Sequence, residues 1–155
     1  MTYLSIMAAA AKAAHVSTTL LYAICAHESK DFSLDFAEYD NGSPSYGVCQ
    51  VKEDTARFLG FKGKSMELRN PMIGAKYAAL YLKYQLDRYS GNVYKAVAAY
   101  NAGSFIESKK RPGFAANHKY INLVKQKLDK RLQHVLDSNN TNYFIDKMEL
   151  SYESR

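Results

Sequence analysis

The stretch AICAHESKDF, residues 23–32, places one carboxylate, Glu28, directly after the buried side of a predicted helix. Counting back by three, four and seven residues gives Cys25, Ile24 and Leu21, so Glu28 shares a helical face with apolar side chains. We expect that face to point inward. Lost hydration and the negative end of the helix macrodipole both favour a protonated carboxyl, the form in which a general acid acts. The alternative is a glutamate that marks the helix boundary and reaches solvent.

The residues around Glu28 argue against two other chemistries. His27 and Glu28 resemble the start of a zinc protease signature, but the second histidine that this signature needs is replaced by Asp31. No metal site and no cofactor are therefore expected. His27 and Ser29 cannot share a proton, because each helical residue is rotated by about 100° from the one before, and side chains two positions apart do not face each other. The remaining histidines are expected at the surface: His15, His118 and His134.

Outward from this stretch, the pattern of caps and apolar spacing predicts a mainly α-helical fold. Between residues 30 and 44 the periodicity is lost, which indicates an irregular loop with at most a small β-hairpin. The expected helices cover residues 2–14, the segment from the Ser17 cap to about Ser29, residues 53–61, the segment from Pro71 to Gly91, the segment from the Asn92 cap to Gly103, and residues 117–136.

Length and composition are those of one globular domain. The chain has 155 residues, of which 47% are hydrophobic and 23% charged, close to average usage. We expect a folded domain over residues 1–137 and a polar tail over residues 138–155. No apolar run approaches the roughly 20 residues that cross a bilayer, and the opening residues lack the basic start and apolar centre of a signal peptide. Neither an integral membrane segment nor an export signal is expected.

Cysteine content and charge give two further expectations. Cys25 and Cys49 are too few for a disulfide framework and wrongly spaced for structural zinc, so we expect reduced, packed thiols, with a bridge as the alternative. The net charge of +6 favours a polyanionic partner, which could be nucleic acid, a membrane surface or an acidic cell-wall polymer.

Two more stretches narrow the function. SPSYGVCQV, residues 43–51, predicts a turn that presents Gln50, and AAYNAG, residues 98–103, places Tyr100 and Asn101 at a helix end. In this order, HES, GVCQ and AYNAG resemble the motifs of the lytic transglycosylase (SLT) domain, a lysozyme-like family that cleaves bacterial peptidoglycan. The segments NPMIGAKYAALYLKYQL and HKYINLV are similar to its intervening and later helices. The resemblance covers about residues 11–127 and implies a lysozyme-like, goose-type helical domain, with residues 1–137 as the catalytic domain.

The resemblance also implies roles for individual residues. Glu28 matches the catalytic acid and base, Gln50 matches a substrate-binding glutamine, and Tyr100 and Asn101 match residues that line the glycan cleft. Ser45 and Tyr120 are further candidates for substrate binding, although Tyr120 could equally belong to the core. The family usually has methionine where this chain has Cys49, which would reshape the cleft floor.

Lytic transglycosylases use one carboxylate, whereas ordinary glycoside hydrolases use two. The resemblance implies cleavage between N-acetylmuramic acid and N-acetylglucosamine with a 1,6-anhydro product. Goose-type lysozymes, which hydrolyse this bond, carry an aspartate where this chain reads Asn41, with Asp40 beside it. The alternatives are therefore a goose-type lysozyme and a catalytically silent wall-binding or virion component. A DNA-binding domain would explain the charge but not the ordered motifs.

The same resemblance gives a partner and a location. The expected partner is the peptidoglycan glycan strand, bound by a monomer that binds no nucleic acid. The basic segment KKRPG, residues 109–113, and the lysines after His118 would favour adsorption to the wall, or would simply form a solvated basic face. Without a signal peptide, the protein would be made in the bacterial cytoplasm and act on the periplasmic cell wall, either phage-borne or released through a holin or a secretion machine.

Overall fold

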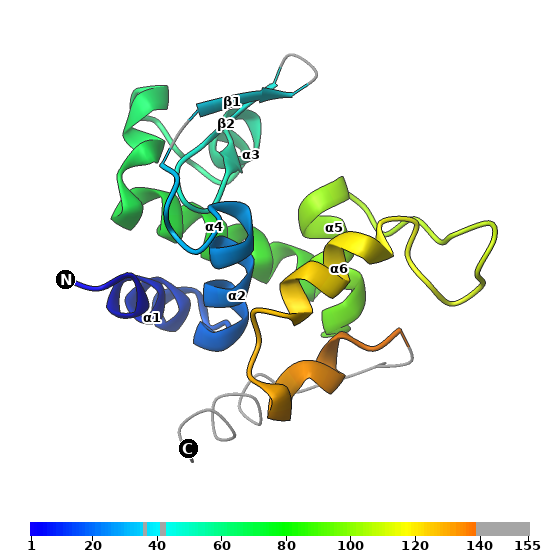
Figure 1. Ribbon diagram of the computed structural model, residues 1–155. Helices are drawn as coiled ribbons and strands as arrows, with labels where there is room; N and C mark the ends of the chain where they lie inside the picture. Colours follow the sequence, from blue (N-terminus) through cyan, green and yellow to red (C-terminus); the bar gives the residue numbers. More distant parts are fainter. Residues whose placement is uncertain (36, 41–42, 139–155) are drawn as a thin grey trace. The chain divides into compact units, whose positions relative to one another are not determined.

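The computed structural model describes residues 1–35, 37–40 and 43–138 (Figure 1). Its internal contacts divide the chain into two compact units, Met1–Tyr81 and Leu82–Arg155. The expected tail over residues 138–155 lies outside the described residues except for Ser138.

Two packed helices open the first unit. Helix α1 (Tyr3–Ala14) begins after Thr2, whose hydroxyl accepts a hydrogen bond from the Ser5 N–H, and α2 (Thr18–Glu28) begins after Ser17, which caps the Leu20 N–H in the same way. The two helices pack against each other (Figure 1). Helix α2 is buried on nearly all sides, as expected for the central helix of a core.

A three-stranded antiparallel sheet follows α2. Strands β1 (Ala37–Asp40), β2 (Ser43–Tyr46) and β3 (Val51–Lys52) lie in the order β1-β2-β3, with β2 in the centre. Tyr46 is opposite Ala37 on one side and Val51 on the other. The expected hairpin is therefore present, and β3 adds a strand that the sequence pattern did not indicate. Helix α3 (Glu53–Phe58) and the 3₁₀ helix η1 (Ser65–Arg69) pack against β2.

A disulfide joins Cys25 of α2 to Cys49, which lies between β2 and β3. The expectation of reduced thiols is therefore wrong. Both cysteines are fully buried, so the same apolar packing that suggested inert thiols also brings the two sulfurs together. Sequence spacing could not reveal this contact, because it depends on how the loop after α2 folds back over that helix.

Helix α4 (Pro71–Arg88) runs from the first unit into the second, since the boundary between the units falls after Tyr81. It starts as predicted, with Asn70 accepting a hydrogen bond from the Met72 N–H and Pro71 at the first helical position. Helix α5 (Val93–Ala102) also matches its prediction, with Asn92 as cap and Gly103 in the left-handed conformation that ends it.

The expected helix over residues 117–136 is two elements. Helix α6 (His118–Lys125) ends first, and the 3₁₀ helix η2 (Lys130–Leu136) follows after a short break. Asp129 explains the break, because its carboxylate accepts the Arg131 N–H and so starts a new helix. Both elements pack on α5, and the buried apolar residues at their contact form the core of the second unit: Val97, Ile121, Val124, Leu132, Val135 and Leu136.

The mainly helical fold is thus confirmed, with one small sheet among the described residues. None of the described helices combines the length and apolarity that a membrane crossing requires.

We expect the disulfide to contribute about 3 kcal/mol to stability, because it closes a loop between residues 24 positions apart. The Cys25→Ala/Cys49→Ala double variant should therefore unfold at a clearly lower denaturant concentration than the oxidised parent, as measured by circular dichroism. The reduced parent, kept in dithiothreitol, is the control and should approach the double variant. Equal midpoints for all three, or two free thiols in the untreated parent by alkylation and mass spectrometry, would contradict the bridge.

Candidate active site

Glu28 is the last residue of α2 and is half-buried. The three residues that precede it on the same helical face, Leu21, Ile24 and Cys25, have no exposed surface. The prediction that this face points inward is therefore confirmed, and Glu28 lies where the buried face of α2 approaches the surface.

A tight turn after Glu28 fixes the end of α2. The buried Ser29 hydroxyl donates to the Cys25 carbonyl (2.7 Å) and accepts from the Phe32 N–H (2.9 Å). Three consecutive non-glycine residues, Lys30, Asp31 and Phe32, then have φ angles of 50°, 57° and 61°. Such left-handed residues cost about 1 kcal/mol or more each, and they persist only where the surroundings determine them.

Aromatic packing helps to hold this turn in its left-handed conformation. The Phe32 ring stacks on Tyr3 of α1 at 4.5 Å between centroids and lies 5.0 Å from the ring of Tyr22 of α2. Ser29 and Phe32 therefore fix the path of the chain directly after Glu28, the last residue of α2. The sequence placed Ser29 at the helix end, within the HES motif, and argued against a nucleophilic role, but it did not predict these hydrogen bonds.

Gln50 closes the turn between β2 and β3. Both its backbone N–H (3.0 Å) and its side-chain Nε2 (2.9 Å) donate to the Gly47 carbonyl, and its own φ is 47°. Gly47 has a φ of +74°, and a Cβ there would lie 2.8 Å from the Leu68 carbonyl oxygen. Only glycine meets both conditions, which explains the first residue of the GVCQ motif. Ser45, the other candidate in this region, is a buried residue of β2 opposite Lys52.

The disulfide unites these two pieces of the first unit. Cys25 lies one helical turn before Glu28, and Cys49 directly precedes Gln50. The helix end that carries the carboxyl and the turn that carries the amide are therefore covalently connected. Glu28, Ser45 and Gln50 all belong to the first unit, Met1–Tyr81.

Tyr100, Asn101 and Tyr120 belong to the second unit. Tyr100 and Asn101 lie in the last turn of α5, where Tyr100 is buried and Asn101 is exposed. Tyr120 is a buried residue of α6, which packs on α5. Burial fits the alternative that Tyr120 is a core residue. Contact of Tyr100 or Tyr120 with the substrate stays a prediction.

Asn117, which sequence reasoning used only as a helix start, holds Asn101 in place. Its Nδ2 donates to the Asn101 Oδ1 and to the Ala98 carbonyl, both at 3.0 Å. It makes no capping hydrogen bond to α6. This hydrogen bond orients the Asn101 amide, whose oxygen is the acceptor. The only sign of this role in the sequence was an asparagine directly before a helix.

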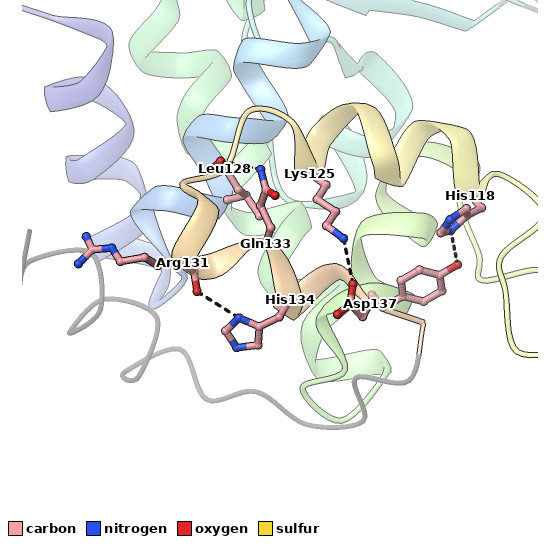
Figure 2. A network of polar contacts seen from close by, with 8 residues as sticks. His118, Lys125, Leu128, Arg131, Gln133, His134 and Asp137 are labelled. Atoms are coloured by element: carbon pink, nitrogen blue, oxygen red, sulfur yellow. Dashed lines mark hydrogen bonds and ion pairs between the residues drawn. The ribbon is translucent and has the colours of Figure 1, made fainter.

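His118 differs from the expected surface histidine. It is half-buried, and its Nδ1 lies 2.9 Å from the hydroxyl of Tyr94, a contact shown in Figure 2. Burial, followed by the positive charges of Arg111 and Lys125, lowers the pKa of His118. His15 and His134 are exposed as expected. Among the described residues, no group of three or more His, Cys, Asp or Glu side chains could hold a metal ion.

Comparison with known proteins identifies the family of this chain. Residues 5–122 match the family described as Transglycosylase SLT domain. Over 98 residues the chain is 33% identical to Protein IpgF of Shigella sonnei and to Protein IpgF of Shigella flexneri. Each match covers 62% of this chain and 64% of the relative, so the chain spans slightly less than two thirds of these relatives.

A solved structure shares the fold. It is the lytic transglycosylase Slt of Pseudomonas aeruginosa, studied as an inactive mutant in which glutamine replaces a glutamate. The TM-score is 0.60 at 20% identity, and the likeness covers 97% of this chain and 24% of that chain. The lysozyme-like helical fold expected from the sequence is thereby confirmed. With the family match extending over more than half of its residues, this chain belongs to the transglycosylase SLT domain family.

Proposed function

We propose that this protein is a peptidoglycan lytic transglycosylase in which Glu28 is the catalytic carboxylate. One observation carries the proposal: in a chain of this family, a disulfide joins the helix that ends at Glu28 to the turn that presents Gln50. A half-buried carboxyl at a helix end that is itself held by a disulfide and by hydrogen bonds fits the preorganisation that general acid catalysis requires.

In the proposed reaction, Glu28 acts first as acid and then as base. Its carboxyl proton moves to the glycosidic oxygen between N-acetylmuramic acid and N-acetylglucosamine as the bond from that oxygen to the muramyl C1 breaks. The resulting carboxylate takes the proton of the muramyl C6 hydroxyl, and the C6 oxygen bonds to C1. The product has a 1,6-anhydro end, no water is consumed, and Glu28 is protonated again.

This sequence of steps requires only one carboxylate because the nucleophile belongs to the substrate. An intramolecular hydroxyl is already close to C1 and gains a large effective concentration, so no second residue has to hold a water molecule. We propose that Gln50, Ser45, Tyr100, Asn101 and Tyr120 contact the glycan and orient it. Gln50 and Asn101 support this role best, since a hydrogen bond holds each amide at the end of an element. Gln50 donates to the Gly47 carbonyl, and Asn101 accepts from Asn117.

The disulfide also bears on where the protein works. Structural disulfides form and persist in oxidising compartments such as the bacterial periplasm and are rare in the cytosol. The buried Cys25–Cys49 bridge therefore supports action on the cell wall outside the cytoplasm. The route by which the protein arrives there, including release from a phage or through a secretion machine, stays a prediction.

The competing function is hydrolysis by a goose-type lysozyme, with Asp40 activating water. Asp40 is the last residue of β1, opposite Ser43 in the hairpin, and Asn41 lies outside the described residues. The products of the reaction separate the two functions.

Glu28→Gln keeps the size of the side chain and removes the proton donor. We expect wall-lytic activity to fall by at least about 100-fold, because general acid catalysis contributes factors of this size. Activity is measured as loss of turbidity of purified peptidoglycan. The matched control is Glu67→Gln, an exposed glutamate of η1 in the same unit, which should lyse at the parent rate. Comparable lysis by a folded Glu28→Gln protein would refute the assignment.

Gln50→Ala should reduce turnover by at least about tenfold, because substrate positioning is lost. The melting temperature should change little, since the Gly47 carbonyl keeps the hydrogen bond from the backbone N–H of residue 50. Turnover and thermal unfolding are measured on the same preparation. An unfolded variant would show that Gln50 is structural and that the substrate lies elsewhere.

The products should carry 1,6-anhydromuramic ends. Mass spectrometry would find muropeptides one water lighter than hydrolysed ones, and a reducing-sugar assay should stay flat while turbidity falls. Asp40→Asn should then leave the rate within about tenfold of the parent, because a residue without a proton-transfer role contributes no general-base term. New reducing ends, together with an inactive Asp40→Asn variant, would instead identify a two-carboxylate hydrolase.

A further inference from the structure

The second unit contains a cationic cavity that the proposed reaction does not use. It has a volume of about 320 Å³ and lies between the basic loop after α5 and the start of α6. Two cations, one histidine and two short polar side chains line it together with an apolar wall: Arg111, Lys119, His118, Ser108, Asn122, Phe114, Ala115 and Ala116. No acidic residue is among them.

The loop that forms this cavity is ordered by its own hydrogen bonds. Glu107 and Ala115 form a β-bridge, the Ser108 N–H donates to the Phe114 carbonyl (2.7 Å), and Glu107 accepts from the Gly113 N–H (2.9 Å). The Ser108 hydroxyl accepts the Arg111 N–H. The segment KKRPG is therefore held in one conformation, which a merely solvated basic turn would not need.

Arg111 is oriented for a planar anion. Its guanidinium carbon lies 4.0 Å from the centroid of the Phe114 ring, and that ring is nearly perpendicular to the His118 ring, with 4.9 Å between the two centroids. A guanidinium stacked on an aromatic face keeps its N–H edge available for two parallel hydrogen bonds to a carboxylate. Over residues 1–35, 37–40 and 43–138, neither Arg111 nor Lys119 has an acidic partner.

His118 contributes a donor rather than a further charge. The Tyr94 hydroxyl accepts the Ala115 N–H (2.8 Å), and its oxygen lies 2.9 Å from Nδ1 of His118. In the neutral tautomer in which this hydroxyl donates to Nδ1, the ring carries its proton on Nε2. Burial and the charges of Arg111 and Lys125 lower the pKa of His118, which fits a neutral ring in a positive potential. Lys125 itself pairs with Asp137 at 3.0 Å, as Figure 2 shows.

We propose that this cavity binds a free carboxylate of the stem peptides that peptidoglycan carries. The planar guanidinium, the neutral imidazole donor and the wall of Phe114, Ala115 and Ala116 suit a carboxylate next to a short apolar side chain better than a more highly charged phosphate. The inference rests on the proposed function, since it names a second contact with the same wall. It assigns to Arg111 a role that its loop neighbours Lys109 and Lys110, which do not line the cavity, should lack.

The test uses the full chain and three probes: a soluble stem tetrapeptide with free carboxylates, the same peptide with its carboxylates amidated, and inorganic phosphate. Binding is followed by NMR of the His118 imidazole and the Arg111 side chain. We expect the free peptide to bind at least about tenfold more tightly than the amidated form, as loss of a charge-assisted bidentate contact predicts. Equal binding of the amidated peptide, or tighter binding of phosphate, would overturn the proposal.

Matched variants locate the effect. Arg111→Ala should weaken binding about tenfold, whereas Lys110→Ala, which removes the same charge from the same loop, should weaken it less than about threefold because Lys110 does not line the cavity and its charge is screened by salt. Arg111→Lys, which keeps the charge without the planar fork, should fall between them. Identical affinities for Arg111→Ala and Lys110→Ala would show that only net charge matters and would refute the site.

The peptide assay measures binding and involves no bond cleavage, so its result tests this inference independently of the proposed function. A protein that cuts peptide-free glycan strands but does not bind the free peptide would overturn this inference alone. A protein that binds the peptide but cuts no glycan would overturn the proposed function alone. Arg111→Ala should cut peptide-free strands at the parent rate, since Arg111 has no part in the chemistry at Glu28.

Discussion

The Cys25–Cys49 disulfide is the constraint on which the geometry of the first unit depends. Helix α2 is buried along most of its length, so its position is fixed by the core, and the bridge transfers that fixed position to the turn between β2 and β3. Glu28 and Gln50 each lie within three residues of a bridged cysteine. Two side chains that are 22 residues apart in the sequence therefore share one rigid support.

Unusual backbone conformations also fix the two turns that follow Glu28 and precede Gln50. The turn after Glu28 holds three left-handed non-glycine residues, and the turn at Gln50 needs Gly47 because η1 approaches its backbone so closely. Such conformations occur where surrounding contacts over-determine them, and they are concentrated at functional sites. In the second unit a polar contact takes the place of the bridge, since Asn117 holds Asn101 at the end of α5. Each unit thus presents its amide from a supported element end.

Much of this arrangement could be predicted from local sequence. Caps at Ser17, Asn70 and Asn92 gave correct helix starts, because capping depends on residues only two or three positions apart. The ordered motifs identified the family. Three features that were missed depend on contacts between residues far apart in the sequence: the disulfide, the hydrogen bond from Asn117 and the buried environment of His118. Strand β3 was missed because its two residues are too few to show an alternating pattern. The break before η2 was missed for a different reason, since the apolar spacing continues through it and only Asp129 marks the new start.

The proposed reaction requires the carboxyl at the end of α2 to reach the bond that is cut. The most direct measurement is a crystal structure of the Glu28→Gln protein bound to a glycan strand of alternating N-acetylglucosamine and N-acetylmuramic acid. We expect the amide of residue 28 about 3 Å from the glycosidic oxygen on the muramyl C1, within hydrogen-bond reach of a general acid. A glycan bound away from residue 28, or a different carboxylate at that oxygen, would contradict it.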